Sequence, residues 1–369
     1  MRICWVSPRD IVDCFGDPQF LKRNRAFAVE AEPLVIADKN FSVGMPFAET
    51  DVCKAFHQVC RDGGEWVDTE FWTRVTGQIQ SGLKKWGCSN EEQFKSRCAR
   101  LNRLYASIKD KGVLPKANGD QIKVAIDRLG HPLFVDGRHR LACGLALDVE
   151  QVPVHVIGRH EVWQEFRESL VLYGDRHRGV YQRIDHVDLQ DLPYSHGDNR
   201  MPLLKKALEG YQTAGKHLMD MGAHWGHYSQ QFERLGFRVT AVEKHETFYQ
   251  VMERLRVATR SEFKTVQEAL ERVPLDDVDV ILALSIWHHF LKTPRGLRRL
   301  TALLKRSSAD MILFEAHCPD PPGQMANAHW NPQPDEFAAF IAEHSGLAEV
   351  TRLGECDNGR MLFRLQGEA

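Results

Sequence analysis

Asp220, Gly222, Gly226 and Glu243 have the residue types and the spacing of a nucleotide-cofactor site. Asp220 begins the pattern D-x-G-x-x-x-G, in which glycines leave room for a ligand to approach the backbone amides. Glu243 follows the next apolar run, where a carboxylate can accept hydrogen bonds from both hydroxyls of a ribose. A dinucleotide site has more closely spaced glycines that hold a pyrophosphate. The pattern therefore predicts a cofactor with a ribose and shows no pyrophosphate cradle.

Two adjacent histidines, His288 and His289, follow a strongly apolar run at residues 277–284. A histidine side chain has an ordinary pKa of about 6.5, which suits it to take a proton from a hydroxyl near neutral pH. Either histidine is therefore a candidate catalytic base. The alternative is that both are packed or hydrogen-bonded within their loop, or only shape a pocket.

A third group, Asp136, Gly137, Arg138, His139 and Arg140, stands between a predicted strand and a predicted helix. Cationic side chains and free backbone amides converge there at the N-terminus of the helix, and this arrangement binds phosphate. The alternative is structural: the aspartate caps the helix while both arginines are solvated. Phosphate binding is the favoured interpretation.

Strands and helices must alternate around the first group to position it. Gly236 ends the helix between its first two strands. Alternation of this kind is typical of a parallel sheet with helices on both faces. The predicted strands are residues 218–221, 237–242, 277–284, 310–315 and 360–365, and the helix after the glycine turn is residues 228–235.

This ordered series resembles motif I and the following acidic loop of the class I S-adenosylmethionine-dependent methyltransferases. The resemblance implies an α/β, doubly wound, Rossmann-like sheet over residues 209–369. It also implies that the first acid and the glycine turn flank the methionine part of S-adenosylmethionine, while the second acid holds the ribose. A glycine turn in an ordinary sheet explains the first motif but not the whole series. The implied cofactor-binding residues are Asp220, Gly222, Ala223, Gly226, Glu243 and Ser285, and the implied catalytic residues are His288 and His289.

The loop after the predicted fourth strand limits the methyl acceptor. Residues 285–288 read SIWH, whereas nucleobase amino methyltransferases hold an exocyclic amine with a [DNS]-P-P-[YFW] sequence. This difference argues against DNA modification. An oxygen acceptor, either a hydroxyl or a phosphate on a small molecule or sugar, fits better, while carboxylate and nitrogen acceptors stay open.

Residues 101–157 resemble the ParB N-terminal and sulfiredoxin-like fold, through SIKDKGVL at 107–114, VDGRHRLACGLAL at 135–147 and VPVHVI at 152–157. The superfamily includes CTP-binding partition proteins, sulfiredoxins and free-serine kinases. The resemblance implies an α+β domain over residues 1–172 that binds ATP, ADP or CTP through the phosphate group of residues 136–140. Sulfiredoxin carries its reactive cysteine where this chain has Arg138, and Cys143 faces the helix interior by periodicity. Sulfinic acid reduction is therefore not expected.

Length, charge and composition limit the number of domains and the classes of partner and location. The chain has 369 residues and is 43% hydrophobic, which suits two to three globular domains. A net charge of −2 argues against nucleic acid as the main partner. No apolar run is long enough for a membrane span and the N-terminus lacks a secretory signal, which predicts a cytoplasmic protein. Nine cysteines include no C-x-x-C pair, so no metal site is predicted.

Residues 173–208 are predicted to be a linker between the two domains. Glycines and charges at residues 174–179 break the helix predicted at 163–172. Residues 181–208 are either a lid over the substrate or an irregular packed segment. Within residues 1–100, a strand is expected to begin at residues 6–11, and spaced aromatic residues between 66 and 86 are expected to form helical core. The sequence does not indicate an oligomeric state.

Two functions follow from these features. The first is a methyltransferase of a small-molecule or glycan substrate with an N-terminal phosphate-binding domain, in its sharpest form a bifunctional kinase-methyltransferase. The second is a nucleotide-gated regulatory or DNA-associated protein with a methyltransferase-like sensor domain. Salt-sensitive DNA binding would favour the second function.

Overall fold

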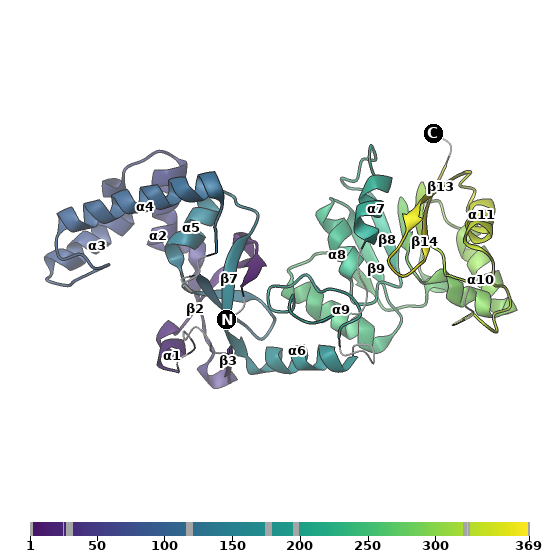
Figure 1. Ribbon diagram of the computed structural model, residues 1–369, viewed down its shortest axis with the longest axis horizontal. Helices are drawn as coiled ribbons and strands as arrows, with labels where there is room; N and C mark the ends of the chain where they lie inside the picture. Colours follow the sequence, from purple (N-terminus) through teal and green to yellow (C-terminus); the bar gives the residue numbers. More distant parts are fainter. Residues whose placement is uncertain are drawn as a thin grey trace. The chain divides into compact units, whose positions relative to one another are not determined.

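The computed structural model describes residues 3–24, 26, 32–115, 121–173, 179–194, 199–319, 323 and 325–367. The chain forms two compact units, each with its own sheet (Figure 1). The first unit comprises Met1–Leu170 and Asp185–Asp191, and the second comprises Val171–Ile184 and Leu192–Ala369. Most of the break predicted at residues 174–179 lies outside the described residues.

The first unit contains a seven-stranded mixed sheet. Its order is β1-β7-β5-β6-β2-β4, with β3 also paired to β7. Strands β5 and β6 form an antiparallel hairpin, while β5 runs parallel to β7. The strands are β1 (Cys4–Val6), β2 (Asp13–Phe15), β3 (Leu34–Ile36), β4 (Val43–Pro46), β5 (Ile122–Ile126), β6 (Pro132–Asp136) and β7 (Val152–His160).

An outer strand and an interior strand of this sheet differ in burial. The strand expected near residues 6–11 is found slightly earlier, as β1, and pairs antiparallel with β7. All five residues of β5 are buried. Strand β5 lies in the interior of the sheet between β7 and β6, and interior strands covered on both faces have no exposed side.

Helices of the first unit gather around an aromatic core. Trp66 and Phe71 are buried, and Trp86 packs against Phe71 with ring centroids 5.9 Å apart. The indole nitrogen of Trp66 donates to Asn102 Oδ1 at 2.8 Å, so its burial leaves no polar atom unsatisfied. The expected helical core is therefore present. The helices are α1 (Pro18–Arg23), α2 (Asp51–Phe56), α3 (Glu70–Gln80), α4 (Glu91–Lys111), α5 (Arg138–Ala146) and α6 (Glu161–Tyr173).

The segment Asp185–Asp191 packs in the first unit although its flanking residues belong to the second. Its Asp188 is buried and accepts hydrogen bonds from Arg159 Nε at 2.8 Å and from Trp163 Nε1 at 2.9 Å. Arg167 pairs with Asp191 in the same segment. A buried carboxylate with these donors is stable only in this position, so this part of the predicted lid is a fixed piece of the first unit.

The second unit contains a doubly wound, Rossmann-like sheet in the order β10-β9-β8-β11-β12-β14-β13. Five strands are parallel, and β14 is antiparallel to both of its neighbours. The order reverses between β8 and β11, which is the point where such sheets bind ligands. The strands are β8 (His217–Met221), β9 (Arg238–Val242), β10 (Lys264–Val266), β11 (Val280–Ala283), β12 (Met311–Glu315), β13 (Glu349–Glu355) and β14 (Met361–Gln366).

Helices cover both faces of this sheet. Alternate residues of its strands enter two separate clusters of buried side chains, such as Met219 in one and Leu218 in the other. Among the described residues, no helix is both long and apolar enough to cross a membrane. The helices are α7 (Arg200–Ala207), α8 (His227–Arg234), α9 (Glu246–Ala258), α10 (Pro294–Lys305) and α11 (Pro334–Ser345).

A buried ion pair joins α7 to the sheet. Arg200 Nε lies 2.7 Å from Glu315 Oε1, and the two side chains are 5% and 0% exposed. Arg200 also donates to the hydroxyl of Tyr228 at 3.3 Å. Because neither charge can be solvated where it lies, each depends on the other for compensation.

Replacing Arg200 with methionine should destabilise the second unit by roughly 3 kcal/mol, because Glu315 would remain buried with only Arg360, 3.9 Å away, to balance it. Hydrogen exchange of the β12 amides measures this change. The matched control is Arg352→Met, which breaks an ion pair with Asp335 in which both side chains are more than half exposed, and it should change exchange little. Equal effects of the two substitutions would contradict the assigned importance of the buried pair.

Candidate functional site

The glycine turn after β8 shapes the floor of a site at the switch point of the second sheet. Gly222 has φ of +80°, and a Cβ there would lie 2.8 Å from Ile286 Cγ1, so a larger residue is excluded by backbone conformation and by space. The amides of Gly222 and Ala223 both donate to Val242 O at 2.9 Å. The expectation that these amides face a ligand is therefore wrong, because the neighbouring strand uses them. At Gly222 the turn therefore offers a ligand space, while the amides of Gly222 and Ala223 stay bonded to β9.

Asp220 lies near the end of β8 and is 4% exposed. Ser229 Oγ donates to its carboxylate at 2.6 Å. Burial raises the pKa of Asp220 to about 6, and the charge of Glu243 adds to this effect. Its buried position thus disfavours the ionised form of the Asp220 carboxylate, and a cation bound nearby would stabilise that form.

Glu243 follows β9 directly and is also buried. Its Oε2 accepts from the amide of His224 at 3.0 Å, and its Oε1 accepts from the amide of His245 at 2.8 Å. Because a carboxylate has about four lone-pair sites, two remain after these bonds. The remaining sites suit the two hydroxyls of a ribose.

A pocket of about 380 Å³ opens beside Gly222 and Glu243. This volume lies within the range of small-molecule sites. Its walls come from the carboxyl ends of β8 and β9, the segment after β10, and the start of α10. The lining residues are Gly222, Val242, Glu243, Lys244, Glu268, Leu270, Glu271, Ile286, His289, Phe290, Thr293, Arg295, Gly296 and Arg299.

The structure separates the residues predicted for the cofactor site. Gly222 and Glu243 line the pocket, and Gly226 begins α8 as its N-cap with φ of +79°. Ala223 is buried in the turn. Ser285 instead donates its hydroxyl to Glu315. Two of the six predicted residues therefore line the pocket, and a cofactor contact by any of the six stays a prediction.

The two predicted catalytic histidines differ in their surroundings. His289 lines the pocket, and burial together with Lys292 and other nearby cations lowers its pKa. His288 is 3% exposed and stacks beside His289 with ring centroids 4.2 Å apart. His289 is therefore neutral and near the pocket, and a catalytic role for either histidine stays a prediction.

Several charged pocket residues were missed by sequence reasoning. Glu268 and Glu271 follow β10, a strand of only three residues that has no recognisable pattern. Arg295 and Arg299 lie one turn apart on α10 and face the same pocket. Lys244 was detectable, because it follows Glu243 directly and therefore lies at the same edge of the sheet.

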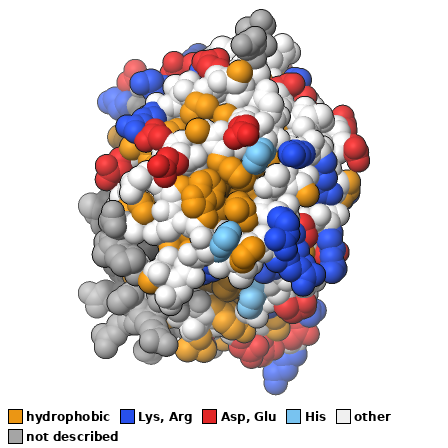
Figure 2. Space-filling model, turned by 90° about the vertical axis from the view of Figure 1, so that its right-hand side faces the viewer, with side chains coloured by type: hydrophobic (Ala, Val, Ile, Leu, Met, Phe, Trp, Pro, Cys, Tyr) orange, Lys and Arg blue, Asp and Glu red, His pale blue; other side chains and the backbone are white. Residues whose placement is uncertain are grey.

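The outer face of the second unit carries both signs of charge. Figure 2 shows hydrophobic side chains gathered near the middle of this face, histidines beside them, and a group of Lys and Arg to one side. Acidic side chains lie along the top of the same view. This face therefore does not present a continuous basic surface of the kind that tracks a nucleic acid backbone.

In the first unit, Gly137 begins α5 with φ of +92°, and a Cβ there would lie 2.8 Å from Ile122 Cα. Asp136 Oδ1 accepts from the amide of Gly137 at 2.8 Å. The N-cap residue Gly137 makes no side-chain cap hydrogen bond to the helix. The first-turn amides of α5 are thus left without the cap that the structural alternative required of Asp136.

Arg138 of α5 and Arg97 of α4 both lie over one indole ring. Arg138 lies 5.0 Å and Arg97 lies 5.5 Å from the ring of Trp86. The imidazole of His139 packs on the same ring, and burial with the two arginine charges lowers its pKa to about 4. Arg140 is 8% exposed. Three cationic side chains and one neutral imidazole therefore gather at this end of α5.

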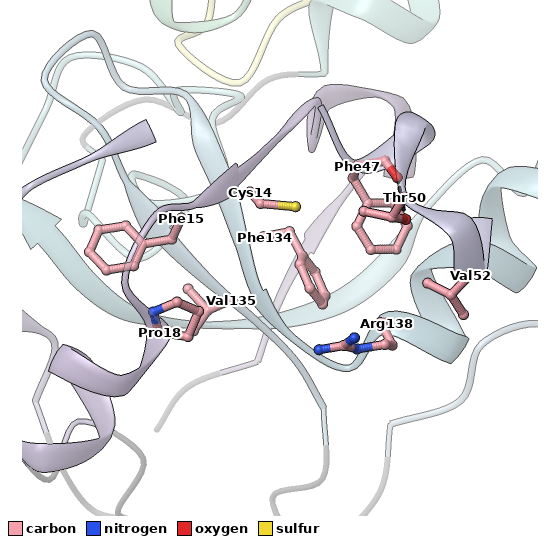
Figure 3. Close-up of a pocket in the computed structure, with 9 residues that line it drawn as sticks. All are labelled: Cys14, Phe15, Pro18, Phe47, Thr50, Val52, Phe134, Val135 and Arg138. Carbon is pink, nitrogen blue, oxygen red and sulfur yellow. Dashed lines mark hydrogen bonds between the residues drawn. The ribbon is translucent and has the colours of Figure 1, made fainter. Parts of the chain in front are cut away.

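A second, smaller pocket of about 150 Å³ lies beside Arg138 (Figure 3). Aromatic rings form much of its wall, and Cys14 and Thr50 add small polar groups. Figure 3 shows Cys14, Phe134 and Arg138 arranged around one cavity from three different elements. The lining residues are Cys14, Phe15, Pro18, Phe47, Thr50, Val52, Phe134, Val135 and Arg138.

Comparison with known proteins places the methyltransferase character in the second unit. The methyltransferase domain family matches residues 219–309, a range that includes Gly222, Glu243 and His289. Among curated proteins, none matches the chain in sequence. The match and the pocket at the switch point agree, so the second unit contains an S-adenosylmethionine-dependent methyltransferase domain.

Solved structures with detectable similarity are distant. The bifunctional kinase-methyltransferase WbdD is 15% identical, with a TM-score of 0.41 over 55% of this chain and 46% of that protein. Magnesium protoporphyrin IX methyltransferase from Synechocystis PCC 6803 is 10% identical, with a TM-score of 0.36 over 46% and 77%. The methyltransferase domain of bacterial CtHen1 is 16% identical, with a TM-score of 0.36 over 46% and 97%. The chain thus spans under half the length of WbdD. The resemblance of the first unit of this chain to the ParB and sulfiredoxin-like fold stays a prediction.

Asp220→Asn should stabilise the second unit above pH 6. The raised pKa means that the native state binds the proton more tightly than the unfolded state, so stability falls as pH rises from about 3.8 through about 6. Replacing the Asp220 carboxylate by an amide should remove this fall in the free energy of unfolding, which is on the order of 3 kcal/mol. Scanning calorimetry across this pH range measures it. Asp276→Asn, at an exposed position of the same unit, is the control, and an unchanged profile in Asp220→Asn would refute the buried charge.

Proposed function

We propose that this protein transfers a methyl group from S-adenosylmethionine to an oxygen of a small-molecule or sugar acceptor. The observation that carries the proposal is the carboxylate of Glu243. It lines the pocket, directly follows the second strand of a doubly wound sheet, and retains acceptor sites after bonding two backbone amides. These are the requirements for holding a ribose at such a position.

The residues at the switch point suit the parts of this cofactor. Glu243 would hold the ribose, and the space above Gly222 would admit the chain that joins the ribose to the methionine part. Asp220 offers a buried negative charge beside the same turn, which favours a cationic group nearby. When bound, the cofactor supplies a methyl group already activated by its sulfonium. The chain then needs only to align the acceptor, exclude water and accept a proton.

An oxygen acceptor fits this site better than a nucleobase amine. The loop after β11 carries SIWH where nucleobase amino methyltransferases have a proline-containing sequence. His289 lines the pocket with its pKa lowered, so this imidazole adds no positive charge that would repel the cationic sulfonium.

Glu243→Gln should weaken binding of S-adenosylmethionine to the full chain ten- to a hundredfold, or about 1.5 to 3 kcal/mol, because charge-assisted bonds to the ribose become neutral ones. Isothermal titration calorimetry measures the affinity. Glu262→Gln, at an exposed position outside the pocket, is the matched control. If the two variants bind the cofactor equally well, Glu243 does not hold it.

We further propose that the first unit binds the phosphates of a nucleotide at the N-terminus of α5. Two features support this: the N-cap residue of α5 is a glycine that makes no side-chain cap hydrogen bond, and Arg138 and Arg140 lie in the first turn of the helix, with Arg97 on the same indole ring as Arg138. Arg138 also borders the pocket of Figure 3, whose aromatic walls suit a planar base. In the kinase version of this proposal, ATP is consumed and its phosphoryl group passes to the acceptor.

Arg138→Gln should weaken nucleotide binding about tenfold or more, because it removes a bidentate phosphate partner. The titrants are ATP, ADP, CTP and GTP, and calorimetry on the full chain is the measurement. Arg128→Gln, an exposed arginine in the β5–β6 turn of the same unit, should leave binding unchanged. If all four nucleotides fail to bind the unaltered chain, the phosphate site and the kinase version are both wrong.

A further inference from the structure

His317 lies two residues after β12, at the edge of the sheet where parallel strands end, and it is 2% exposed. Its Nε2 is 2.7 Å from the amide oxygen of Asn331. An amide oxygen only accepts hydrogen bonds, so Nε2 carries the ring proton and Nδ1 presents a lone pair. Within the described part of the chain, Nδ1 has no hydrogen-bond partner although it is buried.

An unpartnered, buried acceptor with a fixed tautomer requires a physical explanation, because buried polar atoms are nearly always paired. A donor hydroxyl brought by a ligand would supply the missing hydrogen bond. Asn331 fixes the ring so that the lone pair has one direction. The imidazole of His317 is thus oriented as a base before any ligand arrives.

The groups around His317 keep it neutral. Burial lowers its pKa and the charge of Arg360 lowers it further, while the hydrogen bond to Asn331 acts in the opposite direction. The other neighbours are aromatic: the rings of His288 and Phe337 lie 5.9 and 6.0 Å away. An uncharged imidazole in these surroundings can accept a proton at neutral pH.

Among the described residues, Arg360 has one ion-pair partner, the carboxylate of Glu315, which belongs to the strand end just before His317. Its guanidinium is 3.9 Å from Glu315 Oε2, whereas Arg200 binds the same carboxylate at 2.7 Å. Glu315 also accepts hydrogen bonds from Ser285 and Asn358. Two guanidinium groups therefore share one carboxylate, and Arg360 is the more distant of the two.

The charge of Arg360 affects two histidines of the second unit. It lowers the pKa of His317 and also that of His289, which lines the cofactor pocket. The amide of Ala316 donates to the carbonyl of Met361 at 2.9 Å, which places the β13–β14 turn next to the end of β12. Arg360, the residue before β14, therefore lies at the same end of the sheet as the segment after β12 that carries His317.

We propose that Arg360 and His317 form the acceptor subsite of the methyltransferase. Arg360 binds an anionic group of the acceptor, a carboxylate or a phosphate, and His317 Nδ1 takes the proton of the hydroxyl that is methylated. The O–H bond breaks, its proton moves to Nδ1, and the oxygen gains the methyl group, whose former bonding pair stays on sulfur. The imidazolium then returns its proton to water. This inference rests on the proposed function and narrows its acceptor to hydroxylated anions.

The first test reads the imidazole of His317 by nitrogen NMR in the full chain labelled at histidine, with the signal assigned through its contact with Asn331. We expect Nε2 protonated and Nδ1 unprotonated at neutral pH. Titration with inorganic phosphate, and separately with acetate, should shift this signal to saturation, and the stronger titrant identifies the preferred anion. A protonated Nδ1, or a signal that neither anion moves, would overturn the proposal.

Arg360→Gln should weaken the anion response at least tenfold. The matched control is Arg352→Gln, an exposed arginine on the adjacent strand β13, which should respond as the unaltered chain does. Equal responses of the two variants would show that Arg360 does not bind the anion. The tautomer of His317 and the response of its signal to anions are both measured without turnover. The tautomer is measured in the unaltered chain, so it can be tested even if a variant fails to fold.

Turnover separates a base from a structural histidine. With hydroxycarboxylic acids and sugar phosphates as trial acceptors, and their amides and free sugars as comparisons, the anionic members should react preferentially. His317→Gln should lower kcat at least a hundredfold with S-adenosylmethionine affinity unchanged, whereas Arg360→Gln should raise KM for the anionic acceptor alone. Preference for the uncharged members would overturn the subsite. If the unaltered chain does not bind S-adenosylmethionine, the proposed function itself is refuted.

Discussion

The second unit depends on three carboxylates that are buried at one edge of its sheet. Asp220, Glu243 and Glu315 lie at the carboxyl ends of β8, β9 and β12 and are 4%, 8% and 1% exposed. Each is compensated differently: a serine hydroxyl bonds the first, two backbone amides bond the second, and an arginine pairs with the third. The groups that already bond each carboxylate determine what it can still bind. Asp220 therefore favours a cation, Glu243 favours hydroxyl donors, and Glu315 has its acceptor sites occupied.

The cofactor side of this edge was predictable because its residues are close in sequence. Asp220, Gly222 and Glu243 lie on one strand–turn–helix–strand segment, so their spacing alone indicates the pocket. The opposite side was not predictable. Arg360 approaches His317 only through the antiparallel pairing of β12 with β14, and no local pattern records which residues two distant strands bring together. The methyltransferase resemblance implied a cofactor contact for Ser285, whereas its hydrogen bond to Glu315 depends on the pairing of β11 with β12.

The first unit shows the same limit. The hairpin of β5 and β6 and the helix α5 follow from alternation, a glycine turn and helical periodicity. The return of Asp185–Asp191 to this unit depends on Arg159 and Asp188, which are far apart in sequence and form a bidentate pair. A charged residue that is buried by such a partner looks the same in a sequence as one that is solvated. The segment therefore resembled a linker until its contacts were known.

His139 Nε2 and His317 Nδ1 are both buried atoms without a hydrogen-bond partner among the described residues, and their surroundings differ. The imidazole of His139 packs at a tilt against the rings of Trp86 and Phe56, and these rings do not fix its tautomer. Asn331 bonds one nitrogen of His317 and thereby fixes the lone pair of the other. Orientation by a second group distinguishes a base from a packed ring. The unpaired nitrogen of His139 is thus explained by aromatic packing, and that of His317 by a ligand that donates a proton.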